Sequence, residues 1–274
     1  MNMKKLFFLA AVMACSLTPS VAGEKLDLKQ ITRGEFRSES MQAVCPMADG
    51  ESYSQICNDG KRIVNFSFRT GKQLNVLFDV ETARGEKISR VDGYIMGPDG
   101  RYMLIQTVTK PIYRRSFTAV YYIYDIRNNK LMPLSDGGPQ QTPVFSPDGN
   151  LIAFVRDNNI HLVKLLYGNA ESQVTKDGKF NEVINGIPDW VYEEEFSTNS
   201  SMVFSADSKQ IVWIRYDETD VKQYSLQLYK GLAPEMTDYA EYPGDYTYKY
   251  PVPGQVISKV SVHSFDIKSH QMRR

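Results

Sequence analysis

Residues 146–154, Ser-Pro-Asp-Gly-Asn-Leu-Ile-Ala-Phe, join a tight turn to an apolar strand. Proline presets φ for a turn, aspartate bonds its own backbone, and glycine tolerates a positive φ. The apolar run that follows is typical of a strand buried inside a sheet. Turn and strand together predict one unit of an antiparallel β structure.

Three further copies of this unit predict a repeating all-β fold. Asp59-Gly60, Pro98-Asp99-Gly100 and Ala206-Asp207-Ser208 each precede an apolar run. The aspartates stand at positions 59, 99, 148 and 207, so the spacings are 40, 49 and 59 residues. Such spacings, with several short strands per unit, are typical of β-propeller blades. The alternative is a β-sandwich with coincident hairpin turns.

A second strand is expected after each of the last three turns, at residues 120–124, 160–163 and 224–229. Helices longer than two turns are not predicted after the N-terminal segment. About four to five blades do not close a larger ring. We therefore expect residues 23–274 to form the N-terminal part of an incomplete β-propeller.

Composition excludes several classes of function. The chain has 274 residues, with 32 Lys and Arg against 32 Asp and Glu, so its formal net charge is zero. A nucleic-acid binder would carry a basic surplus, and we expect no nucleic-acid partner. The sequence contains neither a metal-ligand cluster nor a phosphate-binding glycine loop, so we expect no cofactor.

The N-terminus resembles a secretion signal over residues 1–22. Lys4-Lys5 precede an apolar run over residues 6–14, and Ser20-Val21-Ala22 offers a cleavage site. We expect an exported protein that is periplasmic, secreted or at the cell surface. A lipoprotein signal with Cys15 as the lipidated residue is a second interpretation, and a buried N-terminal strand is a third.

Two cysteines, Cys45 and Cys57, would remain after cleavage, in an oxidising compartment. They flank a loop that contains Asp49-Gly50. A disulfide between them is possible in principle, and two free thiols are the alternative, because sequence does not give their separation.

The segment Asp189-Trp190-Val191-Tyr192-Glu193-Glu194-Glu195-Phe196 concentrates negative charge beside two aromatic residues. A solvated acidic surface is the plain interpretation. The sharper one is capture of a cation, because two carboxylates aimed at one point can hold an ammonium through charge-assisted hydrogen bonds.

This segment resembles the double-glutamate motif of the dipeptidyl peptidase IV family. The resemblance implies that Glu194 and Glu195 bind the substrate's N-terminal ammonium, with Glu193 outside the pair. Residues 113–119, Tyr-Arg-Arg-Ser-Phe-Thr-Ala, are similar to the family segment whose arginine binds a substrate carbonyl, and Arg114 takes that position. Residues 213–221 and Tyr250-Pro251 also match the family, in the same order.

By this resemblance the partners are peptides with a free N-terminus, from which the family releases dipeptides that have Pro or Ala next to the scissile bond. Homodimers of the full-length enzyme are common in the family. The family's Ser-His-Asp triad belongs to an α/β-hydrolase domain. The alternatives are a stand-alone exported propeller that acts as a binding or scaffold module, and a non-functional truncated product.

The 274-residue chain should release no chromophore from a Gly-Pro anilide. A nucleophile elbow needs Gly-x-Ser-x-Gly. The segment Gly50-Glu51-Ser52-Tyr53-Ser54 fails at the last position, and strands do not alternate with helices. The measurement is absorbance of the released aniline. Turnover that a serine-directed inhibitor blocks would contradict the prediction.

Overall fold

The computed structural model describes residues 26–38, 43–229 and 242–274, and the chain divides into two units, residues 1–43 and 44–274. The expected signal segment, residues 1–22 with Cys15, lies outside the described residues. Among the residues that are described, no helix combines the length and apolar character that a membrane crossing requires.

The described part of the first unit contains one short helix, α2 (Leu28–Arg33). Asp27 caps it: its side chain accepts a hydrogen bond from the Lys29 N–H, while the Gln30 side chain accepts one from the Asp27 N–H. This reciprocal arrangement is a capping box, which satisfies backbone donors that have no partner within the helix. Gly34 ends the helix in the left-handed conformation.

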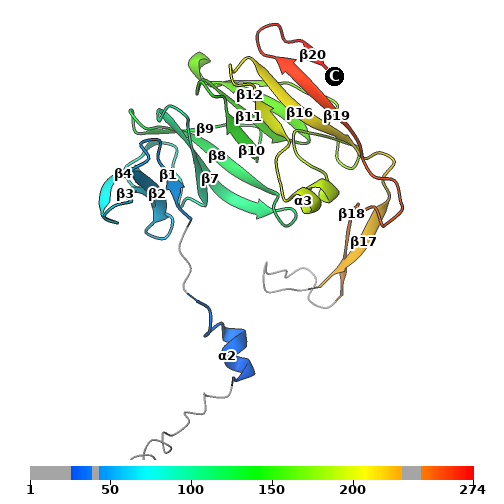
Figure 1. Cartoon of the computed structure of the whole chain (residues 1–274), viewed down its shortest axis with the longest axis horizontal. Coiled ribbons are helices and arrows are strands. Elements are labelled where there is room, and N and C mark those ends of the chain that lie inside the picture. The colour runs from blue at the N-terminus through cyan, green and yellow to red at the C-terminus, as the bar shows by residue number, and fades with distance from the viewer. Residues whose placement is uncertain (1–25, 39–42, 230–241) are drawn as a thin grey trace, which may run out of the picture. The chain divides into compact units, whose positions relative to one another are not determined.

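The second unit consists almost wholly of β-sheets that follow one another along the chain (Figure 1). Sheet 1 contains, in order, β1 (Cys45–Pro46), β2 (Ser52–Cys57), β3 (Arg62–Ser67) and β4 (Gln73–Asp79). Sheet 2 contains, in order, β5 (Arg84–Gly85), β9 (Lys130–Pro133), β8 (Phe117–Asp125), β7 (Tyr102–Pro111) and β6 (Gly93–Met96). All these pairings are antiparallel except that of β5 with β9.

Sheet 3 contains, in order, β10 (Gln141–Phe145), β11 (Leu151–Arg156), β12 (Asn159–Lys164) and β13 (Ala170–Gln173), with the short 3-10 helix η1 (Leu165–Tyr167) between the last two. Sheet 4 contains, in order, β14 (Val183–Asn185), β16 (Gln210–Asp217), β19 (Lys259–Asp266) and β20 (Met272–Arg273), and β15 (Met202–Phe204) also pairs with β16. A separate hairpin joins β17 (Gln223–Leu228) to β18 (Gly244–Lys249), and helix α3 (Trp190–Phe196) precedes β15. The expectation of an all-β fold with only short helices is confirmed.

Three of the four predicted turns share one hydrogen-bond design. Asp99, Asp148 and Asp207 each accept a hydrogen bond from the backbone N–H two residues later, at 3.0, 3.1 and 3.2 Å. The turn at Asp59 differs, because Asn58, Asp59 and Gly60 all have positive φ. An aspartate that binds its own backbone in this way favours a turn over continued strand, so each sheet reverses direction at these points.

Turns of neighbouring sheets also contact one another. The Arg101 guanidinium in sheet 2 donates to the Asn150 side-chain oxygen in sheet 3 at 2.9 Å, and the Asp148 N–H donates to Ser208 Oγ in sheet 4 at 3.0 Å. Gly149 has φ +70°, and a Cβ placed there would lie 3.1 Å from the Asp99 carboxyl carbon. A glycine at this position therefore permits both the backbone conformation and the close approach of the two turns.

The core lies between the sheets, because β7 in sheet 2 and β11 in sheet 3 bury side chains on both faces. Met103 and Ile105 of β7 pack toward sheet 1, whereas Leu104 packs toward sheet 3. Ile152 and Phe154 of β11 belong to that second cluster. Ala153 and Val155, which point to the other face of β11, join a third cluster with residues of sheet 4, namely Ile184, Ile211, Trp213 and Tyr216. Because side chains alternate between the two faces of a strand, one strand contributes to the interfaces with both neighbouring sheets.

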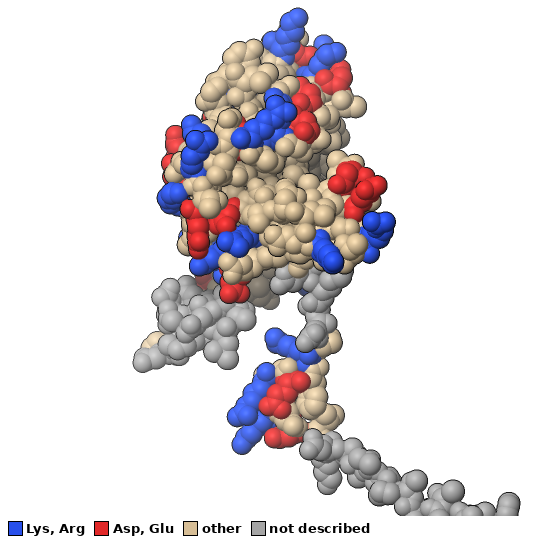
Figure 2. All heavy atoms as spheres, turned by 90° about the vertical axis from the view of Figure 1, so that its left-hand side faces the viewer, with Lys and Arg blue, Asp and Glu red and all other residues tan. Residues whose placement is uncertain are grey.

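Charges on the outer surface are mixed in sign. On the face shown in Figure 2, basic and acidic side chains of the second unit are interspersed rather than gathered into patches of one sign. Arg62 contacts Asp79 at 2.7 Å and Lys61 contacts Glu81 at 3.8 Å, both in sheet 1 or at its edge. This face carries no concentrated field that would attract a polyanion.

The strand expected at residues 224–229 does not belong to sheet 4. The predicted strand at residues 224–229 exists as β17, but it pairs with β18 rather than with β16. The partner of β16 is β19, and their register runs from Gln210 opposite Asp266 to Asp217 opposite Lys259. Most of β17 is exposed, whereas alternate residues of β16 are buried. The register of β16 with β19 spans eight residues, and it places the Trp213 ring against the His263 ring.

The disulfide that the sequence left open is absent, and both Cys45 and Cys57 are free thiols. Strand register explains this: Cys45 lies opposite Ser54, and Cys57 is three residues further along β2. Three residues of strand extend about 10 Å. A disulfide requires Cα atoms within roughly 7 Å, so the extended strand keeps the thiols apart.

Replacing Phe154 by alanine should lower the free energy of unfolding by about 3–5 kcal/mol, because the ring is fully buried between sheets 2 and 3. Val203→Ala is the control: this strand residue is 61% exposed, and its loss should cost below about 0.5 kcal/mol. Urea denaturation of the chain measures both. Equal losses for the two variants would show that the core does not lie between the sheets.

Candidate functional site

The acidic segment forms a helix, α3, which sequence reasoning treated only as a run of charges. Asp189 begins it: Oδ1 accepts a hydrogen bond from the Tyr192 N–H at 2.8 Å, and Oδ2 accepts one from the Ser258 hydroxyl. Asp189 is 5% exposed, so both bonds are shielded from water. An N-cap aspartate with a glutamate in the first turn is a recognisable helix start, and both residues were present in the sequence.

The chain enters this helix through a glycine in the left-handed region. Gly186 has φ +79°, and a Cβ there would lie 3.1 Å from a side-chain carbon of Ile160 in β12. Its N–H donates to the Ile214 carbonyl at 3.2 Å, and its carbonyl accepts from the Ser201 N–H at 2.9 Å. The strand β14 therefore turns sharply over sheet 3 and delivers α3 to the edge of the sheets.

Arg114 lies on the loop 112–116, which joins β7 to β8 in sheet 2. The Ile112 N–H donates to the Ser116 carbonyl at 2.9 Å, and the Tyr113 N–H donates to Ser116 Oγ at 3.3 Å. These bonds close the loop at its base. They leave the backbone of Arg114 and Arg115 at the tip.

The structure brings two of the three predicted site residues together. Arg114 Nε lies 2.9 Å from Glu194 Oε2 and 3.3 Å from Oε1. The Glu194 side chain is 21% exposed and the Arg114 side chain 71% exposed, so the pair sits at the surface. Glu195 is exposed, and within the described ranges no hydrogen bond or ion pair of its side chain is found.

Glu193 makes the contacts that the sequence did not foresee. Its carboxylate is 1% exposed, and Oε1 accepts hydrogen bonds from the backbone N–H groups of Arg115 at 2.7 Å and Ser116 at 2.9 Å. Its Oε2 atom is buried without a partner among the described residues. Adjacent acids on this helix thus have three environments: Glu193 buried, Glu194 half-buried and paired, Glu195 exposed.

Aromatic side chains from the β17–β18 hairpin support this helix. The Trp190 ring lies 4.2 Å from the Tyr250 ring and 6.0 Å from the Tyr248 ring, measured between centroids. Tyr248 also lies 5.5 Å from Tyr113 of the arginine loop. Trp190 therefore packs against aromatic residues at the end of this hairpin, a contact that no local pattern predicts because β18 is far from α3 in sequence.

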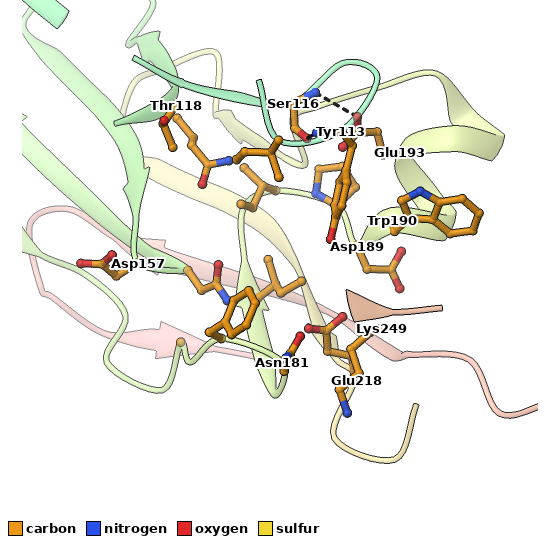
Figure 3. Close-up of a pocket in the computed structure, with 18 of the residues that line it drawn as sticks. Tyr113, Ser116, Thr118, Asp157, Asn181, Asp189, Trp190, Glu193, Glu218 and Lys249 are labelled. Carbon is orange, nitrogen blue, oxygen red and sulfur yellow. Dashed lines mark hydrogen bonds between the residues drawn. The ribbon is translucent and has the colours of Figure 1, made fainter. Parts of the chain in front are cut away.

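A pocket of about 430 Å³ lies beside the helix and the arginine loop. Figure 3 shows Ser116 and Glu193 at one end, Glu218 and Lys249 at the other, and Asp189 and Trp190 along the side nearest α3. The remaining wall comes from the β11–β12 turn and from the segment before β14. Glu193 and Asp189 line this pocket, while Glu194 and Glu195 do not.

Glu218 lines this pocket, and its carboxyl group has a strongly raised pKa. Burial raises its pKa to about 7, and the nearby Asp189 carboxylate acts in the same direction, while Lys249 opposes them. Burial likewise raises the pKa of Tyr113, so its hydroxyl stays protonated. A buried carboxyl with such a pKa changes its charge near neutrality.

The three histidines are engaged elsewhere. His161 Nδ1 lies 2.9 Å from Glu171, and its ring stacks on Phe154. The His263 ring stacks on Trp213, and the His270 ring packs against Phe265. Across the part of the chain that the structure describes, no group of three or more His, Cys, Asp or Glu side chains is placed to hold a metal ion.

Comparison with known proteins identifies relatives over most of the chain. A model of the dipeptidyl peptidase IV (DPP IV) N-terminal region matches residues 97–274, a range that contains Arg114 and the whole of α3. Dipeptidyl-aminopeptidase B of Aspergillus niger is 30% identical over 282 aligned residues, which cover 92% of this chain and 30% of that protein.

Solved structures give the same result. The crystal structure of Porphyromonas gingivalis dipeptidyl peptidase 4 matches with a TM-score of 0.84 and 38% identity, covering 92% of this chain and 35% of that chain. A protein from Bacteroides ovatus matches with a TM-score of 0.54 and 17% identity, which supports the fold alone. The chain thus spans about a third of the length of these relatives.

Glu218→Gln should stabilise the chain above pH 7 and have little effect near pH 4. The pKa of Glu218 is raised from its ordinary value of 4.5 to about 7, so the folded state binds a proton that the unfolded state has released. Stability should therefore fall as pH rises through this window, by up to about 3 kcal/mol. Urea denaturation at pH 4, 6 and 8 measures the difference.

The control is Glu86→Gln, because Glu86 is exposed and its carboxylate makes no hydrogen bond or ion pair in the described ranges. The Glu86→Gln variant should keep the pH dependence of the wild type, because Glu86 lies outside the pocket that contains Glu218. A Glu218→Gln effect that is equally independent of pH would show that Glu218 titrates normally.

Proposed function

Because the chain belongs to the dipeptidyl peptidase IV family, whose N-terminal region it matches, we propose that it is the substrate-recognition part of a serine dipeptidyl peptidase. In this proposal it anchors the free N-terminus of a peptide. The observation that carries the proposal is the exposed ion pair of Arg114 with Glu194, formed between the loop of sheet 2 and helix α3.

The chemistry of the pair suits a peptide terminus. Arg114 uses only Nε toward Glu194, so its two terminal nitrogens are left to donate to a substrate carbonyl. The Glu194 carboxylate has lone pairs left over and can accept further hydrogen bonds from an ammonium. The adjacent carboxylate of Glu195 supplies the second negative charge.

Anchoring the ammonium would determine which bond is cut. A peptide held by its first residue places the peptide bond after its second residue at a fixed distance from the anchor. A serine nucleophile at that distance would release a dipeptide, by the acyl-transfer chemistry of a Ser-His-Asp triad. In this proposal the triad, and the preference for Pro or Ala, belong to the part of the longer relatives that this chain does not match.

We propose further that sheets 1–4 are successive blades of a β-propeller. Support comes from the serial order of the sheets and from the apolar clusters that join each sheet to the next. The site then lies where loops of sheets 2 and 4 meet across sheet 3. The N-terminal segment 1–22 would direct export, and peptides outside the cytoplasm would be the substrates.

The tripeptide Gly-Pro-Gly should bind the 274-residue chain, and N-acetylation should abolish most of the binding, because it removes the ammonium. Glu194→Ala should weaken binding by about 30-fold or more, because it leaves the ammonium under-paired. Arg114→Ala should weaken it too, since Glu194 loses the partner that orients it. Isothermal titration calorimetry measures all the affinities.

Glu86→Ala is the matched control, an exposed acid far from α3 in sequence, and it should bind as the wild type does. Equal affinity for the free and acetylated peptides would refute the ammonium site and favour a general binding or scaffold module. Failure of both peptides to bind would refute recognition by this chain.

A further inference from the structure

We propose that Glu193 is a positioning residue: its buried carboxylate fixes the loop 112–116 against α3 and so places Arg114 beside Glu194. The ligand of the Arg114–Glu194 pair rests on the proposed function, whereas the positioning of Arg114 by Glu193 does not. Sequence comparison with the family's double-glutamate motif puts Glu193 outside the binding pair, so this role comes from the contacts alone.

The first step is the geometry of one oxygen atom. Glu193 Oε1 accepts the N–H groups of two consecutive residues, Arg115 at 2.7 Å and Ser116 at 2.9 Å. Both donors belong to a loop that is almost 80 residues away in sequence. The Arg115 N–H belongs to the peptide unit 114–115 and the Ser116 N–H to the unit 115–116, so one carboxylate oxygen fixes the position and orientation of two consecutive peptide planes.

The second step is the burial of the charge. Glu193 is 1% exposed, and its Oε2 atom has no hydrogen-bond partner among the described residues. Burying a carboxylate with one unpaired oxygen is unfavourable, and an apolar side chain would fill the space with less penalty. Stability alone therefore does not explain a glutamate here, whereas fixing two backbone donors does.

The third step connects the loop to the arginine. No hydrogen bond from the Arg114 N–H is found in the described ranges, and its side chain is 71% exposed. A long exposed side chain on an untethered loop would lose much conformational freedom on pairing. With Arg115 and Ser116 fixed, the Cα of Arg114 is already in place, and only its side chain must be ordered.

Two further bonds act on the same loop from the end of α3. The Arg115 guanidinium donates to Ser197 Oγ at 2.9 Å, and the Asn199 side chain donates to the Arg115 carbonyl at 3.2 Å. Both lie nearer the surface than the Glu193 contact. They would hold the loop near α3 without setting the peptide planes, so Glu193 remains the residue that fixes its orientation.

Amide hydrogen exchange of the 274-residue chain, resolved by residue with NMR, tests the inference. In the wild type the amides of Arg115 and Ser116 should exchange at least about tenfold more slowly than that of Arg114, because a hydrogen bond to a charged acceptor must open first. Glu193→Ala should remove this protection. Glu193→Gln keeps an acceptor oxygen and should restore a measurable part of it.

Glu195→Ala is the matched control, because it removes a carboxylate from the same helix that has no contact with the loop, and the exchange pattern should stay as in the wild type. Calorimetry with Gly-Pro-Gly adds a second measurement: Glu193→Ala should weaken binding about tenfold and Glu193→Gln less.

The inference fails if Arg115 and Ser116 exchange as fast as Arg114 in the wild type, which needs no variant to fold. It also fails if Glu193→Gln folds and loses protection to the same extent as an exposed loop. Loss of protection in Glu193→Ala, with no peptide binding in any form of the chain, would leave the positioning role intact and refute the proposed function instead.

Discussion

The inner strands β7 and β11 of sheets 2 and 3 are apolar on both faces, and this single constraint organises the second unit. A sheet with one apolar face can cover it with a helix, but a sheet with two needs a neighbour on each side. Ile152 and Phe154 pack toward sheet 2, while Ala153 and Val155, on the same strand, pack toward sheet 4. Sheets that alternate in this way stack in series, and the turns between their strands come to lie side by side.

Stacking in series also explains where the candidate site is. The loop that carries Arg114 belongs to sheet 2, and the helix that carries the acids lies between β14 and β15 of sheet 4. The two meet beside sheet 3. Buried polar contacts hold each element in place, in addition to the aromatic packing of Trp190 and Tyr113. Asp189 caps the helix and Glu193 receives the loop, so two desolvated carboxylates support one surface ion pair.

Much of this could be predicted from the sequence, for a physical reason. The turn aspartates and the strands after them depend on residues next to one another, and local chemistry is what a sequence displays. Arg114 and Glu194 were likewise found through motifs.

The role of Glu193 was missed because it depends on backbone donors almost 80 residues away, which no local pattern shows. The pairing of β16 with β19 is likewise invisible to local patterns, because β19 begins about 40 residues after β16 ends. The disulfide between Cys45 and Cys57 could not be decided, because it depended on strand register, which places them too far apart.

The pairing of β16 with β19 has a consequence for how the chain folds. Hairpins in sheets 1–3 join strands that are close in sequence, whereas sheet 4 must bridge the segment 218–258 before its central pair can form. Closing a loop of about 40 residues costs only about 2 kcal/mol more entropy than closing one of about five, which the long register readily offsets. The folding rate is affected more than the folding stability, because strands that are distant in sequence take longer to find their native register. Sheet 4 should therefore be completed late in folding, once sheet 3 has formed the apolar face against which it packs. Because helix α3 leads into sheet 4, the candidate site should also form late.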